Sequence, residues 1–82
     1  MGTEKDIKNY EYPRLRVCRE NAELTQKEVA ACLGIDQRIY SNYETGKRQI
    51  PVNLLIRLAK MYDISVDYIL GLSDVKKFSR KK

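Results

Sequence analysis

Apolar residues in the middle of the chain recur with the spacing of helices. Between Tyr12 and Ala22, the apolar residues Leu15, Cys18 and Ala22 stand at i, i+3 and i+7, and the charged residues fall mainly between them. No segment alternates between apolar and polar residues over a useful length, as a half-buried strand would. The pattern therefore predicts short helices and no sheet.

The next segment carries start and stop signals for two further helices. Thr25 and Glu28 have the spacing of a capping box, and an apolar stripe follows them. Gly34 is suited to the left-handed conformation that ends a helix, and Asp36 is a good N-cap for a helix starting directly afterwards. We therefore expect two short helices joined by a turn of about three residues.

The second helix of this pair is expected to run from Gln37 to about Thr45, with Gly46 as its stop. Its apolar side comprises Tyr40 and Tyr43, and Ile39 is a further candidate for that side.

Two more helices complete the pattern. Pro51 is expected at the first position of a fourth helix, and Ser65 is expected to cap a short fifth helix that Gly71 closes. The fourth helix carries a wide apolar stripe, formed by Leu54, Leu55, Leu58, Ala59 and Tyr62. The prediction is an all-α, compact five-helix domain over residues 12–71. Residues 1–11 form an N-terminal arm, and residues 72–82 form a basic C-terminal tail.

The net charge of +5 on the 82 residues comes mostly from the tail. Residues 72–82 contribute +4 and residues 14–71 contribute only +2, while residues 1–13 contribute −1. The tail is interpreted either as a solvated end or as a basic arm that touches phosphates or a partner. Bulk charge therefore gives weak support for nucleic-acid binding by the predicted domain itself.

Several kinds of function find no support in the residue types present. The chain has no His, no glycine-rich phosphate loop and no cluster with metal-ligand spacing, so we expect no enzyme activity, no cofactor and no metal site. Cys18 and Cys32 are interpreted as small core residues in a reducing compartment. Neither a signal peptide nor a membrane-spanning run is present, which favours a cytoplasmic protein.

The exposed side of the predicted third helix carries chemistry suited to DNA bases. Asn and Gln amides can bond bidentately to adenine in the major groove, and Arg can do so to guanine. Gln37, Arg38 and Asn42 stand at i, i+1 and i+5, close to the start of this helix. Two short helices joined by a tight turn, with such residues on the second, are typical of a helix-turn-helix.

The stretch from Arg14 to Gly71 resembles the lambda-repressor-like, Cro/repressor-type helix-turn-helix domain, also called the XRE family. The strings that carry the resemblance are Arg14-Leu15-Arg16, Leu24-Thr25-Gln26-Lys27-Glu28-Val29-Ala30, Leu33-Gly34-Ile35, Ser41-Asn42-Tyr43-Glu44-Thr45-Gly46-Lys47-Arg48, Pro51, Leu54 through Leu58-Ala59-Lys60, and Ile64-Ser65-Val66-Asp67-Tyr68-Ile69-Leu70-Gly71. The resemblance implies a helix-turn-helix at helices 2 and 3, with the third helix reading DNA.

The resemblance also implies roles for individual residues. The base-reading positions are Gln37, Arg38 and Asn42, and the expected contacts to the DNA backbone are Gln26, Ser41, Thr45, Lys47 and Arg48. Gln26 is also expected to brace the third helix. Glu44 is expected to bond a neighbouring helix or to balance an arginine such as Arg14 or Arg48. Two residues depart from the family pattern: Tyr40 stands where an aliphatic residue is usual, so its hydroxyl needs a partner, and Asp36 replaces the usual Ser or Thr.

These expectations describe a bacterial or phage transcriptional regulator, most simply a repressor, on double-stranded DNA. A homodimer, at least on DNA, would meet a palindromic or pseudo-palindromic operator. Because only eleven residues follow Gly71, dimerisation is expected to use the helices of the domain or to arise on DNA. The alternative hypothesis is a protein-interaction module, such as an antitoxin-like domain that binds a protein partner.

Overall fold

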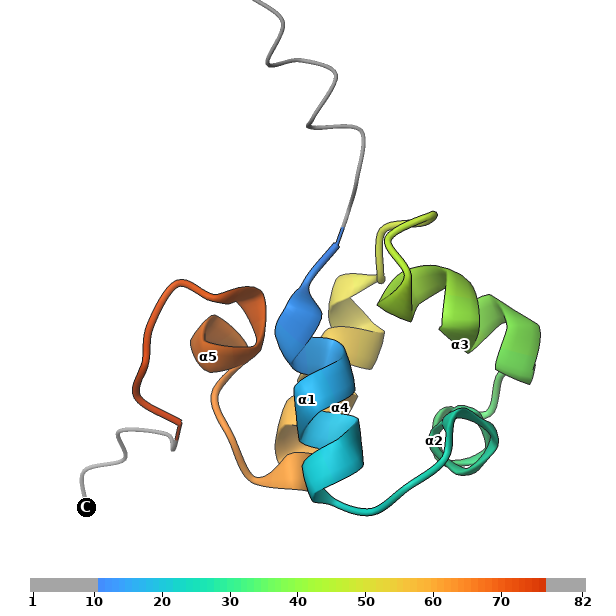
Figure 1. Ribbon diagram of the computed structural model, residues 1–82, viewed down its shortest axis with the longest axis horizontal. Coiled ribbons are helices and arrows are strands. Elements are labelled where there is room, and N and C mark those ends of the chain that lie inside the picture. Colours follow the sequence, from blue (N-terminus) through green and yellow to red (C-terminus); the bar gives the residue numbers. More distant parts are fainter. Residues whose placement is uncertain (1–10, 77–82) are drawn as a thin grey trace, which may run out of the picture.

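Five helices and no strand make up residues 11–76, the part of the chain that the computed structural model describes (Figure 1). The helices are α1 (Pro13–Asn21), α2 (Gln26–Leu33), α3 (Gln37–Glu44), α4 (Val52–Tyr62) and α5 (Val66–Leu70). Most of the predicted N-terminal arm and the end of the basic tail lie outside the described residues. The all-α prediction is confirmed, and no helix within residues 11–76 is long and apolar enough to cross a membrane.

The predicted signals at the ends of α2 and α3 form as expected. The Thr25 hydroxyl accepts the Glu28 backbone N–H at 3.0 Å, and the Glu28 carboxylate accepts the Thr25 N–H at 2.8 Å, which completes the capping box. Gly34 ends α2 with φ at 73°, where a side chain would be strained. The Asp36 carboxylate accepts the Arg38 backbone N–H at 2.9 Å and so caps α3. The tight turn between the two helices is therefore fixed by local hydrogen bonds.

The predicted position of Pro51 is wrong by one residue. Pro51 is the N-cap of α4 in an extended conformation, and the helix begins at Val52. Its carbonyl accepts the N–H groups of Leu54 and Leu55, at 3.1 and 3.0 Å. Proline therefore opens the helix through its carbonyl rather than from within the first turn.

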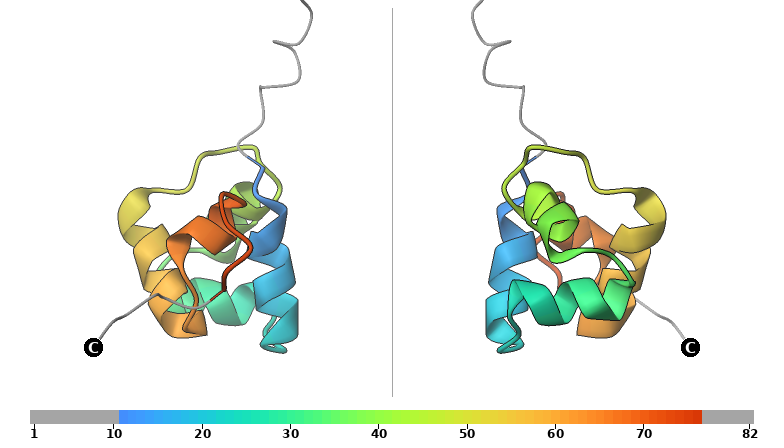
Figure 2. Two further views of the ribbon diagram at one scale, coloured as in Figure 1. Left: turned by 90° about the vertical axis from the view of Figure 1, so that its left-hand side faces the viewer. Right: turned by 90° about the vertical axis from the view of Figure 1, so that its right-hand side faces the viewer.

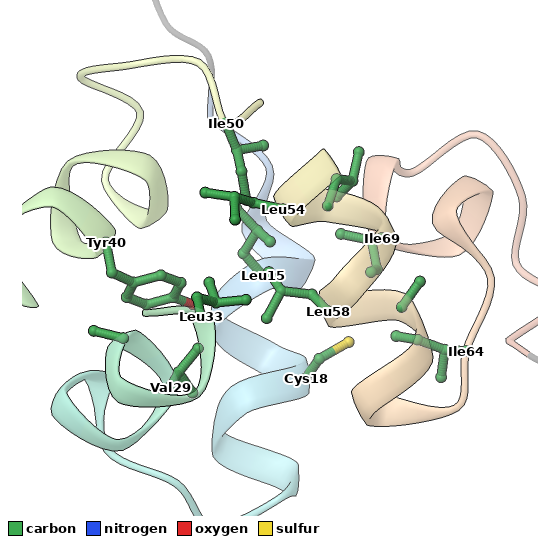
Figure 3. Packing of buried hydrophobic residues seen from close by; sticks show 13 residues of the cluster. Leu15, Cys18, Val29, Leu33, Tyr40, Ile50, Leu54, Leu58, Ile64 and Ile69 are labelled. Carbon is green, nitrogen blue, oxygen red and sulfur yellow. The ribbon is translucent and has the colours of Figure 1, made fainter. Parts of the chain in front are cut away.

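A single hydrophobic core draws residues from all five helices (Figure 3). Leu15, Val29, Tyr40 and Leu58 have no exposed surface, and Ile69 has 1%. The predicted stripe of α4 is confirmed at Leu54, Leu55, Leu58 and Ala59, and Tyr62 packs against the core while only partly buried.

Two residues expected on apolar faces lie outside the core. Cys18 is buried as predicted, and burial raises the pKa of its thiol, but Cys32 is exposed. Cys32 lies off the stripe that Val29, Ala30 and Leu33 present to the core, so its prediction as a core residue is wrong. Ile39 of α3 is likewise not part of the core and exposes 44% of its surface.

The helices α3 and α5 lie on opposite sides of α1 and α4. Helix α2 packs on α3, α1 contacts α3 and α5, and α4 contacts α2 and α5. Figure 1 shows α5 to the left and α3 to the right, with α1 and α4 between them. The outer side of the α2–α3 pair is therefore left uncovered by the other helices, as the right-hand view of Figure 2 shows.

The start of the predicted tail lies against α1 and α5. The Arg14 guanidinium donates to the Tyr68 and Ser73 carbonyls at 2.9 and 2.8 Å and to the Asp74 carboxylate at 2.8 Å. It also lies over the Tyr68 ring, 4.1 Å from the ring centroid. The Ser65 hydroxyl donates to the Val75 carbonyl at 3.2 Å. Residues 72–76 are thus held on the side of the molecule away from α3.

Candidate nucleic-acid interface

The predicted DNA-contacting residues gather on the uncovered side of α2 and α3. Gln37, Arg38 and Thr45 are exposed, and Ser41 and Asn42 are partly exposed. All five belong to α3 or its C-cap, and the opposite side of α3 presents Tyr40 and Glu44 to the interior. The helix therefore separates its polar surface from its buried side, as the sequence predicted.

The structure divides the predicted contact residues into two neighbouring groups. Gln26 at the start of α2 lines a shallow hollow together with Gln37, Arg38 and Ser41 of α3. Lys47 and Arg48 line a second hollow beyond the other end of α3. Cations and amides are thus available at both ends of α3.

Asn42 links α3 to the loop that carries the two cations. Its carbonyl accepts the backbone N–H of Lys47 at 2.9 Å and that of Arg48 at 3.1 Å. Both hydrogen bonds come from the main chain, so the exposed side chains of Lys47 and Arg48 are not used in holding the loop.

Asp36 adds a carboxylate to this otherwise basic surface. Its position at the N-terminus of α3 places a negative charge at the positive end of the helix dipole, which offsets part of that charge. Arg38, Lys47 and Arg48 outnumber it among the surface residues of α3 and the following loop. The surface therefore favours a polyanion while carrying one local acidic position.

A buried carboxylate joins the three helices behind the interface. Glu44 exposes 8% of its surface and is the one buried charged residue within residues 11–76. Its Oε2 accepts Arg19 Nε at 2.7 Å and the Tyr40 hydroxyl at 2.9 Å. Its Oε1 accepts the Gln26 amide at 2.8 Å and the second Arg19 nitrogen at 3.1 Å. Residues from α1, α2 and α3 thus converge on one side chain.

This cluster of Arg19, Gln26, Tyr40 and Glu44 settles three of the expectations. The Tyr40 hydroxyl has its partner, and Gln26 does brace α3. Glu44 bonds neighbouring helices and pairs with an arginine, as expected, but this arginine is Arg19 and not Arg14 or Arg48. Arg14 instead holds residues 73 and 74, and Arg48 lies in the exposed loop. The sequence offers one signal that Arg19 faces inward, which is its position at i+4 from Leu15.

The electrostatics of the cluster favour the ionised form of Glu44. Burial raises the pKa of this carboxyl, but the hydrogen bonds from Arg19, Gln26 and Tyr40 outweigh burial and hold the pKa below its usual range. The hydrogen bond to Glu44 also raises the pKa of Arg19. Burial, and then the neighbouring Glu44 charge, raise the pKa of the Tyr40 hydroxyl, which keeps it protonated as a donor.

Replacing Tyr40 with phenylalanine is expected to lower the free energy of unfolding by about 1–2 kcal/mol, because a buried carboxylate loses one of its donors. Urea denaturation at neutral pH measures this loss. The matched control is Tyr62→Phe, which removes a buried hydroxyl that has no hydrogen-bond partner in the described part of the chain. The control should be neutral or slightly stabilising, and an equal loss in both variants would contradict the role given to the Tyr40 hydroxyl.

The side chains on this surface are of the kinds that make hydrogen bonds and ion pairs with a polyanion. No group of three or more His, Cys, Asp or Glu side chains within residues 11–76 is placed to hold a metal ion. What the surface presents is amides, hydroxyls and cations on a rigid helix pair.

Comparisons with known proteins point in the same direction as this geometry. The sequence profile described as helix-turn-helix matches residues 15–69. The uncharacterized HTH-type transcriptional regulator YobD of Bacillus subtilis (strain 168) is 44% identical over 61 residues, covering 74% of this chain and 54% of that protein. The HTH-type transcriptional regulator ImmR of the same organism is 41% identical over 64 residues, covering 78% and 50%.

A third relative from that organism is the SPbeta prophage-derived uncharacterized HTH-type transcriptional regulator YonR, 33% identical over 57 residues, covering 70% of this chain and 53% of that protein. The chain thus spans about half the length of the curated relatives it matches. No solved structure gives a significant match.

Proposed function

This chain belongs to the helix-turn-helix family in its XRE type, and from that premise we propose that it binds double-stranded DNA and regulates transcription. In this proposal α3 enters the major groove with its N-terminal residues against base edges. The relatives named as transcriptional regulators support the regulatory part of the proposal.

The observation that carries the proposal is the two-sidedness of α3. Tyr40 and Glu44 fix one side of the helix in the interior, and Gln37 and Arg38 stand exposed at its free N-terminal end. The backbone of a helix anchored in this way does not have to be ordered on binding, so only its exposed side chains lose freedom, which favours specific recognition.

The roles proposed for individual residues are those that the family resemblance implies. Gln37, Arg38 and Asn42 are assigned to base edges, and Gln26, Ser41, Thr45, Lys47 and Arg48 are assigned to the DNA backbone. The Gln26 amide nitrogen has two hydrogens and gives one to Glu44, so the other is available to a phosphate oxygen. The Thr45 hydroxyl donates to the Ser41 carbonyl at 2.9 Å, so it must rotate before it can donate to a phosphate.

A homodimer on a palindromic or pseudo-palindromic operator completes the proposal. One recognition helix spans few base pairs, so two copies would contact half-sites about 34 Å apart, one helical turn of DNA. The prophage origin of one relative favours a bacterial or phage regulator. In this proposal the protein acts in the cytoplasm, and repression is its simplest mode of regulation.

Selection of bound sequences from random duplexes, followed by mobility shifts on the best and on a scrambled duplex, tests this function. We expect a preferred site bound at least about 1000-fold more tightly than scrambled DNA, the lower end for specific readers. The stoichiometry on that site should be two chains for each duplex. Equal affinity for all sequences would contradict specific reading, and no binding even at low salt would contradict the whole proposal.

A further inference from the structure

Ile39 is an apolar side chain on the recognition surface that the core does not use. It exposes 44% of its surface, whereas its chain neighbour Tyr40 is fully buried. It is the one large hydrophobic side chain exposed between residues 26 and 49. Single exposed apolar residues are common on proteins, so its position on α3 decides what it can do.

The position of Ile39 is at the edge of the base-reading face. Each residue advances about 100° around a helix, so Ile39 lies about 60° from Asn42 and one turn before it. Residues three apart on a helix are neighbours on its surface. Ile39 is also the third residue of α3, within the N-terminal turn that holds Gln37 and Arg38.

Of the base-edge groups in the major groove, the thymine 5-methyl is the apolar one. An amide such as that of Asn42 pairs bidentately with adenine, and the thymine of that base pair presents its methyl group beside the adenine edge. A branched aliphatic side chain next to the amide is therefore placed to cover this methyl group and remove apolar surface of both partners from water.

We infer that Ile39 is a specificity-determining residue that reads the 5-methyl group of a thymine at or next to the base pair contacted by Asn42. The inference rests on the proposed function, since it needs α3 in the major groove. It adds an apolar selection to the polar readout by Gln37, Arg38 and Asn42.

The test replaces each thymine of the selected duplex, one at a time, with deoxyuridine, which lacks only the methyl group. The full chain should bind one such duplex about fourfold more weakly, the effect expected for one buried carbon. The variant Ile39→Ala should bind the thymine and deoxyuridine duplexes equally, because the side chain that senses the methyl is gone.

Ile56→Ala is the matched control. Ile56 exposes 42% of its surface and lies on α4, which carries none of the residues proposed to contact DNA. This variant should keep the fourfold preference for thymine. The inference is overturned if no thymine shows the penalty, or if Ile39→Ala retains it. A chain that selects no site at all would instead overturn the proposed function, so the two failures are told apart by the initial selection.

Discussion

Replacing Glu44 with alanine is expected to lower the free energy of unfolding by about 3–5 kcal/mol, the range for breaking a buried ion pair from one side. The change leaves the Arg19 guanidinium, 12% exposed, without its bidentate partner. It also leaves the Tyr40 hydroxyl and the Gln26 amide without the acceptor that fixes them. Since small domains have about 5–15 kcal/mol in all, chemical denaturation should find this variant near the limit of folding.

Glu20→Ala provides the control for this experiment. Glu20 pairs with Arg16 at 3.1 Å on the surface of α1, and both side chains are more than half exposed. Its other pairing, with Arg19 of the cluster, is long at 4.0 Å and supplements the bidentate contact of Arg19 with Glu44. Such surface pairs contribute about 0.2–1 kcal/mol, so the control should unfold almost as the parent chain does. If Glu44→Ala and Glu20→Ala lowered the free energy of unfolding by similar amounts, the Glu44 cluster would not have the stabilising role proposed for it.

The same carboxylate gives the stability a dependence on pH. Hydrogen bonds hold the folded-state pKa of Glu44 below its ordinary value of 4.5, so the folded state favours the charged form. The resulting stabilisation is complete above the ordinary pKa and is lost as the pH falls from there through the folded-state pKa. The stability difference between the parent chain and Glu44→Gln should therefore shrink with acidification over this range.

Local signals made most of the helix boundaries predictable from the sequence. The capping box of Thr25 and Glu28, the left-handed Gly34 and the cap at Asp36 each depend on residues within four positions of one another. Short-range chemistry of this kind is fully visible in a sequence. The helix pair and its exposed polar face followed from these signals.

Contacts between distant residues were not predictable in the same way. Arg19 and Glu44 are 25 positions apart, and the i+4 spacing of Arg19 from Leu15 indicates which way Arg19 faces but not which partner it binds. Arg14 finds its partners at positions 68, 73 and 74 for the same reason. The sequence offers several arginines of α1 as partners for Glu44, and the packing of the helices determines that Arg19 is the one that binds it.

The buried and exposed sides of α2 and α3 were also hard to predict. Helices α2 and α3 have eight residues each, so two or three apolar positions define a face and an extra one is easily assigned to it. Cys32 and Ile39 were placed on apolar faces by this spacing and are exposed. Their exposure was decided by which residues α2 and α3 turn toward the other helices.

The double variant Gln37→Ala/Arg38→Ala is expected to bind the selected duplex about 100-fold more weakly, which removes most of its preference for that duplex over scrambled DNA. Each bidentate contact to a base contributes about 1–3 kcal/mol of discrimination, so two lost contacts account for a change of this size. Both side chains are exposed, and α3 keeps its cap because the Asp36 carboxylate bonds the backbone N–H of residue 38. Mobility shifts on both duplexes measure the affinity, and thermal unfolding shows that the fold is retained.

Asn53→Ala/Lys60→Ala is the matched control for this double variant, since it removes one amide and one cation from exposed positions of α4. It should lose little affinity, and what it loses should be equal on both duplexes, because a distant cation acts only through general attraction to phosphates. An equal loss of affinity in the two double variants would mean that α3 contributes positive charge but does not discriminate between DNA sequences. Full regulatory activity in Gln37→Ala/Arg38→Ala without DNA binding would favour the protein-interaction alternative, because the regulation would then depend on a protein partner held elsewhere on the domain.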